Sequence, residues 1–248
     1  MSTKPSFVFL HGGQHGSWCW SRLLSANESQ QPPQALLLDV PGCGLKRARS
    51  HENPTLAEVV AELNTEVLAA DLGPAILVGH SMAGSLMPSM AAQAPQLYSH
   101  LVFLSACLPR RGESVMDTMG QCLAGQDPGV VGWPVDPTSA PPLELLGAMF
   151  GPGLDGPTLQ HLLQEAVQDQ WPMSLATAPV PLDGHLLTQP SSYIVTLQDP
   201  ILPVPWQGRF AERAAVKAMY TLDAPHESFI SHPSELMTLL SQIAAHGP

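Results

Sequence analysis

Basic side chains are scarce in this chain of 248 residues: ten Lys and Arg stand against 21 Asp and Glu, a formal net charge of −11. Nucleic acids and anionic membrane surfaces would repel such a chain, so neither is an expected partner. Long apolar stretches are missing too, since none approaches the roughly 20 residues of a membrane span. The first residues, MSTKPSFVFLHGG, contain no signal-peptide pattern. We therefore expect no membrane span and a cytoplasmic location.

Cysteine is also infrequent, and its placement excludes two further classes of protein. Cys19, Cys43, Cys107 and Cys122 are scattered, with no Cys-x-x-Cys pair and no spacing typical of metal ligands. They are expected to be reduced and mostly buried thiols. The sequence therefore predicts no disulfide framework and no metal site; separately, we expect no bound cofactor.

Short apolar runs alternate along the chain with helix-like stretches. Most runs lack the two-residue alternation of half-exposed strands, which is typical of strands buried on both faces. The runs cover residues 7–10, 35–40, 75–78, 101–104, 193–197 and 216–222. The helix-like stretches cover residues 55–70, 82–94, 203–214 and 234–245. This alternation predicts an α/β fold, a minimal and mostly parallel sheet of about six strands with helices on both faces.

The alternation is interrupted once, between residues 108 and 190. This stretch holds nearly half of the 26 prolines and no convincing strand, but it keeps helical patches such as residues 157–171. A structureless loop of that length is implausible inside a compact domain. We expect a core formed by residues 1–107 and 191–248, with residues 108–190 as an inserted helical lid.

The segment VGHSMAGS, residues 78–85, directly follows the run 75–78. Ser81 is either a helix N-cap or a nucleophile on a sharp strand-to-helix turn. Small residues at Gly79, Ala83 and Gly84 would let backbone segments approach closely around such a turn. The choice depends on whether the chain also supplies a base, an acid and an oxyanion hole.

A base and an acid follow the last two predicted strands. His226 is the expected base. His232 lies at the entrance of a helix whose expected N-cap is Ser234. His80 is expected to be structural. Asp199 is the expected acid, because Asp223 lies on the same short loop as His226 and would not aim well at its ring. The resulting order, Ser81, Asp199, His226, is the chain order of the α/β-hydrolases.

An oxyanion hole is predicted at the end of the first strand, where His11, Gly12 and Gly13 follow FVFL. The backbone N–H groups of Gly13 and Met82 could converge on a developing oxyanion. Together the four parts favour Ser81 as a nucleophile.

These segments resemble the α/β-hydrolase superfamily, and within it the small esterase branch of plant methylesterases, salicylate-binding esterases, hydroxynitrile lyases and bacterial pyrethroid-type esterases. The resemblance rests on HGGQHGSWCW (11–20), LLLDVPGCG (36–44), LVGHSMAG (77–84), LVFLSACLP (101–109), YIVTLQD (193–199) and HESFISHPSEL (226–236). It covers most of the predicted sheet domain and not the details of the lid. Three departures stand out: Ala83 replaces the usual glycine, Pro88 should kink the helix near Gly84, and the chain begins at the first parallel strand.

The lid should determine which substrate is accepted. Its flexible methionines and aromatic rings would form an adaptable apolar roof, and its excess of acidic residues would disfavour anionic substrates. The expected substrate-binding residues are Gly12, His80, Trp133, Met149, Phe150 and Trp171, with Met116, Met119 and Met173 also in the lid. The basic run Lys46, Arg47 and Arg49 is expected to be a solvated loop.

The favoured function is hydrolysis of small apolar or aromatic carboxylic esters through an acyl-serine intermediate. Lactone or amide hydrolysis on the same triad stays open. The resemblance implies that hydroxynitrile lyases carry a lysine directly after the catalytic histidine, where this chain has Glu227. A lyase is therefore disfavoured, and a complete triad argues against a non-enzymatic receptor. The sequence does not decide the oligomeric state, so a homodimer stays open.

Overall fold

A six-stranded parallel sheet forms the centre of the computed structural model, which describes residues 5–26, 33–50, 52–182, 184 and 187–246. Along the sheet the strands follow the order β2-β1-β3-β4-β5-β6, and every neighbouring pair is parallel. They are β1 (Ser6–Leu10), β2 (Gln34–Leu38), β3 (Ala75–His80), β4 (Tyr98–Leu104), β5 (Ser191–Thr196) and β6 (Ala218–Leu222). All six apolar runs of the sequence thus form strands, and the predicted fold class is confirmed.

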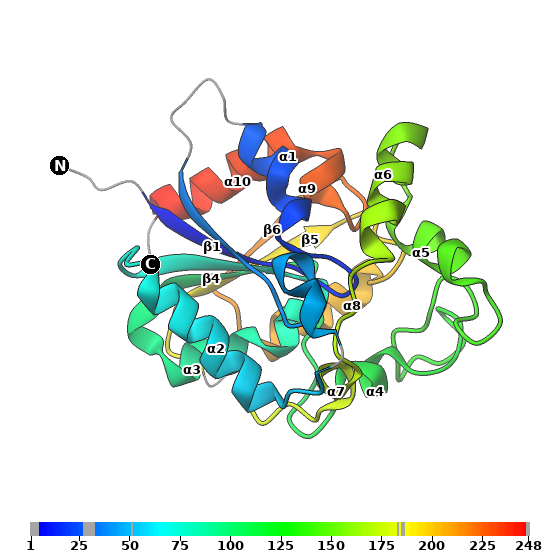
Figure 1. The fold of residues 1–248 in the computed structure, drawn as a ribbon, viewed down its shortest axis with the longest axis horizontal. Coiled ribbons are helices and arrows are strands. Elements are labelled where there is room, and N and C mark those ends of the chain that lie inside the picture. The colour runs from blue at the N-terminus through cyan, green and yellow to red at the C-terminus, as the bar shows by residue number, and fades with distance from the viewer. Residues whose placement is uncertain (1–4, 27–32, 51, 183, 185–186, 247–248) are drawn as a thin grey trace.

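Helices cover both faces of this sheet (Figure 1). On one side lie α1 (Ser21–Ser25), α9 (Ser228–Ser231) and α10 (Pro233–His246), and on the other α2 (Leu56–Ala69) and α3 (Met87–Gln93). α8 (Val204–Arg213) packs against β5. Because β1, β3 and β5 are covered on both faces, every residue in these three strands is buried.

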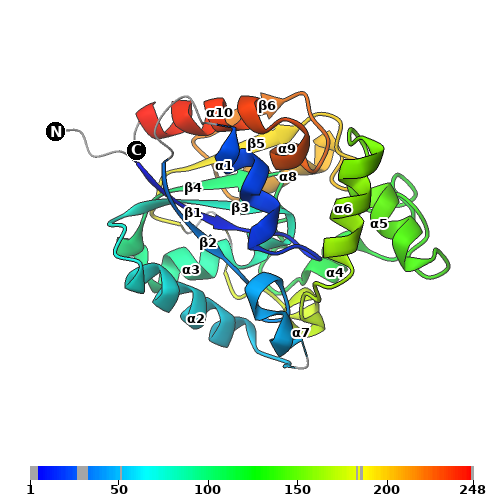
Figure 2. The same cartoon turned by 45° about the horizontal axis from the view of Figure 1, so that its top comes forward.

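The segment between β4 and β5 contains four helices and no strand of the sheet. They are α4 (Val115–Met119), α5 (Pro142–Phe150), α6 (Gly156–Ala166) and α7 (Met173–Thr177), and they gather at one end of the sheet (Figures 1 and 2). We call residues 108–190 the lid segment. The division of the chain into a core, residues 1–107 and 191–248, and an inserted lid, residues 108–190, stays a prediction.

Short 3₁₀ helices complete the described chain. They are η1 (Ser17–Trp20), η2 (Gly44–Arg49), η3 (Ser81–Ser85) and η4 (Pro95–Leu97). The predicted helix over residues 82–94 is therefore divided into η3 and α3, and there is no single helix kinked near Gly84. Pro88 lies in the first turn of α3, where a missing N–H leaves no intrahelical bond unmade.

The last helix also begins earlier than expected. α10 starts at Pro233, and the amide of Leu236 donates to the carbonyl of His232. Ser234 lies inside the first turn and is not the N-cap, because proline at the first helical position already sets the helical φ angle. No helix in the described ranges is long and apolar enough to cross a membrane.

Candidate active site

Ser81 stands where β3 ends and η3 begins. Its φ of 53° places a non-glycine residue in the left-handed region, which is the strained turn expected of an exposed nucleophile. The turn is held in place because the amide of Cys107 donates to the carbonyl of Ser81 at 2.9 Å. A Cβ on Gly84 would lie 2.4 Å from the carbonyl oxygen of Cys107, so only glycine fits there. The N-cap of η3 is His80, so the alternative of Ser81 as the N-cap does not hold.

His226 and Asp199 form a buried pair at the ends of β6 and β5. His226 Nδ1 lies 2.7 Å from Asp199 Oδ2, and both side chains are almost fully buried. Asp199 also accepts hydrogen bonds from the Thr196 hydroxyl and from the amides of Ile201 and Leu202. With its acceptor positions filled, this carboxylate fixes the proton of His226 on Nδ1 and leaves Nε2 of the neutral ring unprotonated.

The electrostatics of His226 agree with that arrangement. Burial lowers its pKa, but the charge and hydrogen bond of Asp199 raise it, and the net result lies above the ordinary 6.5. Asp223, the alternative acid, is exposed and accepts a hydrogen bond from Gln198 instead. His232, the alternative base, pairs with the hydroxyl of Ser231. In the described chain no hydrogen bond joins Ser81 to His226, whose Nε2 is buried without a partner.

His80 packs its ring against that of His226, with centroids 4.3 Å apart. Burial, followed by the neighbouring charge of His226, holds the pKa of His80 well below 6.5. A neutral imidazole is therefore expected at neutral pH, so His80 adds no positive charge beside His226.

The loop after β1 lies directly against the serine turn. A Cβ on Gly12 would lie 2.8 Å from Cβ of Ser81, and one on Gly13 would lie 2.4 Å from Sδ of Met82. The amides of Gly13 and Met82 donate no hydrogen bond within the described residues. Both amides are thus free to bind a ligand oxygen.

A cavity of about 380 Å³ opens beside Ser81. Of the predicted site residues it is lined by Ser81, Gly13, Met82, His80, Trp133, Met149, Phe150 and Trp171. The predicted substrate-binding residue Gly12 is not among the lining residues; it packs against Ser81 and His80. The other lining residues are Gln14, Cys107, Val115, Met116, Met119, Pro142, Leu145, Leu146, Met173, Ala176, Ile201 and Leu202.

No charged side chain belongs to the described lining of this cavity, and five of the lining residues are methionines. Sequence reasoning named four of those methionines in the lid segment but missed aliphatic residues such as Leu145 and Ile201. The position of Ile201, two residues after the predicted site residue Asp199 on the loop beyond β5, could have indicated that Ile201 lies near the site. Leu145 carried none, because an apolar helical residue faces either a cavity or the core.

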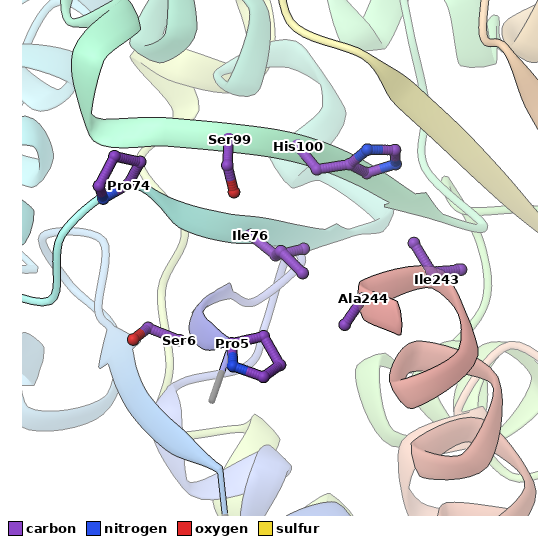
Figure 3. A pocket seen from close by; sticks show the side chains of 8 residues that line it. All are labelled: Pro5, Ser6, Pro74, Ile76, Ser99, His100, Ile243 and Ala244. Carbon is purple, nitrogen blue, oxygen red and sulfur yellow. The ribbon is translucent and has the colours of Figure 1, made fainter. Parts of the chain in front are cut away.

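A second, smaller cavity of about 90 Å³ lies at the opposite end of the strands (Figure 3). It is lined by Pro5, Ser6, Pro74, Ile76, Ser99, His100, Ile243 and Ala244. His100 there lies 2.9 Å from the hydroxyl of Ser192. Among the described residues no carboxylate pairs with this histidine, and Ser192 lies within a strand rather than on a sharp turn. This second serine–histidine pair therefore lacks both the acid and the sharply turned serine of a catalytic triad.

The basic run after β2 is paired with acids instead of being freely solvated. Lys46 contacts Glu62 and Glu66, and Arg49 contacts Glu52 and Glu62. Arg47 reaches the lid segment, where it binds Glu165 and Asp169. None of the three basic residues lines the cavity beside Ser81.

One group of described residues brings candidate metal-binding atoms together: His80, His226 and Glu227, within 4.8 Å of one another. We assign no metal here, because Nε2 of His226 is the atom a base requires and Glu227 contacts His15 at 3.3 Å. Glu227 is fully buried and outside the cavity lining, so its charge does not face a substrate directly.

Comparison with known proteins identifies the family of this chain. A model of the alpha/beta hydrolase family matches residues 7–238, and the chain belongs to that family. It is 27% identical over 260 residues to a putative methylesterase 11, chloroplastic, from Arabidopsis thaliana, covering 98% of this chain and 64% of the relative. A probable esterase from rice, Oryza sativa subsp. indica, is 36% identical over 114 residues, covering 46% of this chain and 43% of the relative.

The chain thus spans less than two thirds of the length of both curated relatives. A solved structure, an extracellular alpha/beta-hydrolase from a Paenibacillus species, superposes with a TM-score of 0.77 at 18% identity, covering 96% of this chain and 98% of that one. The resemblance to the esterase branch is confirmed. A cytoplasmic location stays a prediction.

Proposed function

We propose that this protein is a serine esterase that hydrolyses small apolar or aromatic carboxylic esters. The observation that carries the proposal is the strained Ser81, which lines an apolar cavity next to the buried His226–Asp199 pair. Similarity to proteins named esterase and methylesterase supports the same chemistry.

In the proposed reaction the Ser81 hydroxyl oxygen attacks the ester carbonyl carbon while His226 Nε2 takes the hydroxyl proton. Asp199 holds the opposite ring nitrogen and stabilises the imidazolium that forms. The amides of Gly13 and Met82 bind the oxyanion. The carbon–oxygen bond of the ester then breaks, and His226 returns its proton to the departing alcohol.

The acyl-serine that remains is hydrolysed by the same groups. A water molecule gives a proton to His226 Nε2 and attacks the acyl carbon, and the proton finally returns to Ser81 as the carboxylic acid leaves. Both half-reactions thus use one base and one oxyanion hole.

A fluorophosphonate probe tests the nucleophile. We expect it to label Ser81 with one probe per chain, and Ser81→Ala to lose several orders of magnitude of activity on p-nitrophenyl acetate. The exposed Ser234→Ala is the matched control and should keep both labelling and activity. Labelling at another residue, or full activity in Ser81→Ala, would refute the mechanism.

A further inference from the structure

A buried carboxylate lies directly behind the candidate base. Glu227 follows His226 in the chain, and its side chain is fully buried. Neither of its oxygens has a hydrogen bond of normal geometry, and the nearest partner of Oε2 is Nε2 of His15, at 3.3 Å. A buried carboxylate that lacks donors is strongly unfavourable unless a positive charge compensates it.

The two ring nitrogens of His15 both face acceptors. Nδ1 lies 2.9 Å from the carbonyl oxygen of Gly13, and Nε2 faces the carboxylate of Glu227. A neutral imidazole carries one N–H and cannot donate to both.

His11, on the same loop, shows the neutral arrangement. Its Nδ1 faces the carbonyl of Gly12, while its Nε2 accepts from the amide of Val40. Consistent with that, burial lowers the pKa of His11 to about 4. Among the described residues no donor is bonded to either ring nitrogen of His15, which points to an imidazolium protonated at both nitrogens.

The surroundings of His15 suit a positive charge. The ring of Trp18 stacks on it at 5.3 Å and 20°, a geometry favourable for a cation over an aromatic face. Burial lowers the pKa of His15, but Glu227, the Gly13 carbonyl and the more distant Asp169 raise it above 6.5 overall.

We propose that His15 and Glu227 form a buried imidazolium–carboxylate pair that positions the Gly13 loop against the His226 loop. Each partner is anchored to the element it would position. His15 Nδ1 holds the Gly13 carbonyl, and the carbonyl of Glu227, the N-cap of α9, accepts from the amides of Ile230 and Ser231. That these loops carry the oxyanion hole and the base rests on the proposed function.

The opposite charges of His15 and Glu227 also largely cancel one another in their effect on the proposed base, His226. The titratable groups facing His226 are Asp199, Glu227, His80 and His15. Glu227 raises the pKa of His226 and His15 lowers it, so their effects oppose one another and Asp199 remains the dominant partner. His15 itself faces Glu227, Asp169, His80 and His11.

Nitrogen-15 NMR of the unmodified, resting protein tests the pair directly. We expect both ring nitrogens of His15, assigned through its backbone, to carry protons at pH 7.5, and one of them to lose its proton in Glu227→Gln. A bare Nε2 on His15 in the unmodified protein would overturn the proposal. This measurement needs no activity, so it separates failure of the pair from failure of the proposed esterase.

Kinetics test the positioning role. Glu227→Gln should lower kcat on p-nitrophenyl acetate about tenfold with KM changed less than twofold, because loop geometry and not substrate affinity is altered. His15→Gln should lower kcat by a similar factor. The kcat of the double variant should be no lower than that of the less active single variant. The exposed Glu235→Gln removes the same charge from α10 and should keep full activity. If Glu227→Gln folds and behaves like Glu235→Gln, the positioning role is refuted; if it does not fold, the NMR result decides.

Discussion

At the scale of single residues, the assignment of the acid depends on what each carboxylate contacts. Asp199 is buried, accepts four hydrogen bonds including that of His226, and cannot turn away without breaking the others. Asp223 is exposed and contacts Gln198. Only the first is placed to orient a histidine.

Asp199→Asn should therefore lower kcat by about 10⁴, as loss of the acid does in other Ser-His-Asp triads. The amide would favour the wrong tautomer of His226 and could not stabilise its charged form. Asp223→Asn is the matched control and should lower kcat less than about twofold. Equal losses in the two variants would contradict the assignment.

The acid limb of the pH profile gives a second check on the same residue. Protonated His226 cannot accept a proton, so kcat/KM should fall as the pH drops through its pKa, which Asp199 raises above 6.5. In Asp199→Asn that midpoint should move to lower pH, because the variant lacks the negative charge that raises the pKa of His226. An unchanged midpoint would show that another group titrates.

At the scale of elements, Asp169 ties the lid segment to the loops after β1 and β2. Its buried carboxylate accepts hydrogen bonds from Trp18 Nε1, the Gly44 amide and the Arg47 guanidinium. Although burial raises the pKa of Asp169, these donors hold it below the usual value. Two residues later Trp171 reaches the cavity, so this contact fixes one wall of the site.

Arg47→Ala should thus destabilise the fold by roughly 2–3 kcal/mol, because it leaves a buried carboxylate without its cation. Arg49→Ala, which breaks two partly exposed ion pairs, with Glu52 and Glu62, should cost less than about 1 kcal/mol. Urea denaturation of the two variants measures the difference. Similar values for both would show that the contact with Asp169 contributes little.

Elements differ in how well the sequence predicts them, for physical reasons. The six strands are found because residues such as Leu77 and Val102 must be apolar wherever both faces of a sheet are covered. The break between η3 and α3 is missed because the close contact of Gly84 with Cys107, which tightens the turn, joins residues distant in sequence.

Within the site, too, features that depend on local sequence are predictable and contacts between distant segments are not. The pairing of Asp199 with His226 is predictable because each follows a strand, and parallel strands bring their ends to one edge. The pairing of Glu227 with His15 is not predictable, because the two residues lie on different loops and only the fold brings them together.

At the scale of the whole molecule, the chain's negative charge matters less to the site than its sequence suggests. Several acids of the lid segment are occupied elsewhere: Asp117 and Asp155 cap helices, while Glu165 and Asp169 bind Arg47. The described cavity lining holds no charge of either sign. Rejection of anions should therefore come mainly from desolvation in an apolar cavity and less from a repulsive field.

An ester pair that differs only by a free carboxylate tests this. We expect kcat/KM for the neutral ester to be at least about tenfold higher, and the ratio to change little between low and high salt, because desolvation is not screened. A ratio that collapses at high salt would point to the acidic surface instead. A preference for the charged ester would contradict the proposed substrate class.

The order of the site's parts along the chain has a consequence for protein synthesis. Ser81 and the loop of Gly13 follow β3 and β1, whereas Asp199 and His226 follow β5 and β6, and β4 pairs with β5 through Leu101 and Ser191. A ribosome therefore releases the proposed nucleophile long before the proposed base. Under the proposed function, the growing polypeptide should stay inert toward esters until β5 and β6 have joined the sheet, so the appearance of hydrolysis during translation would report that the last two strands have docked.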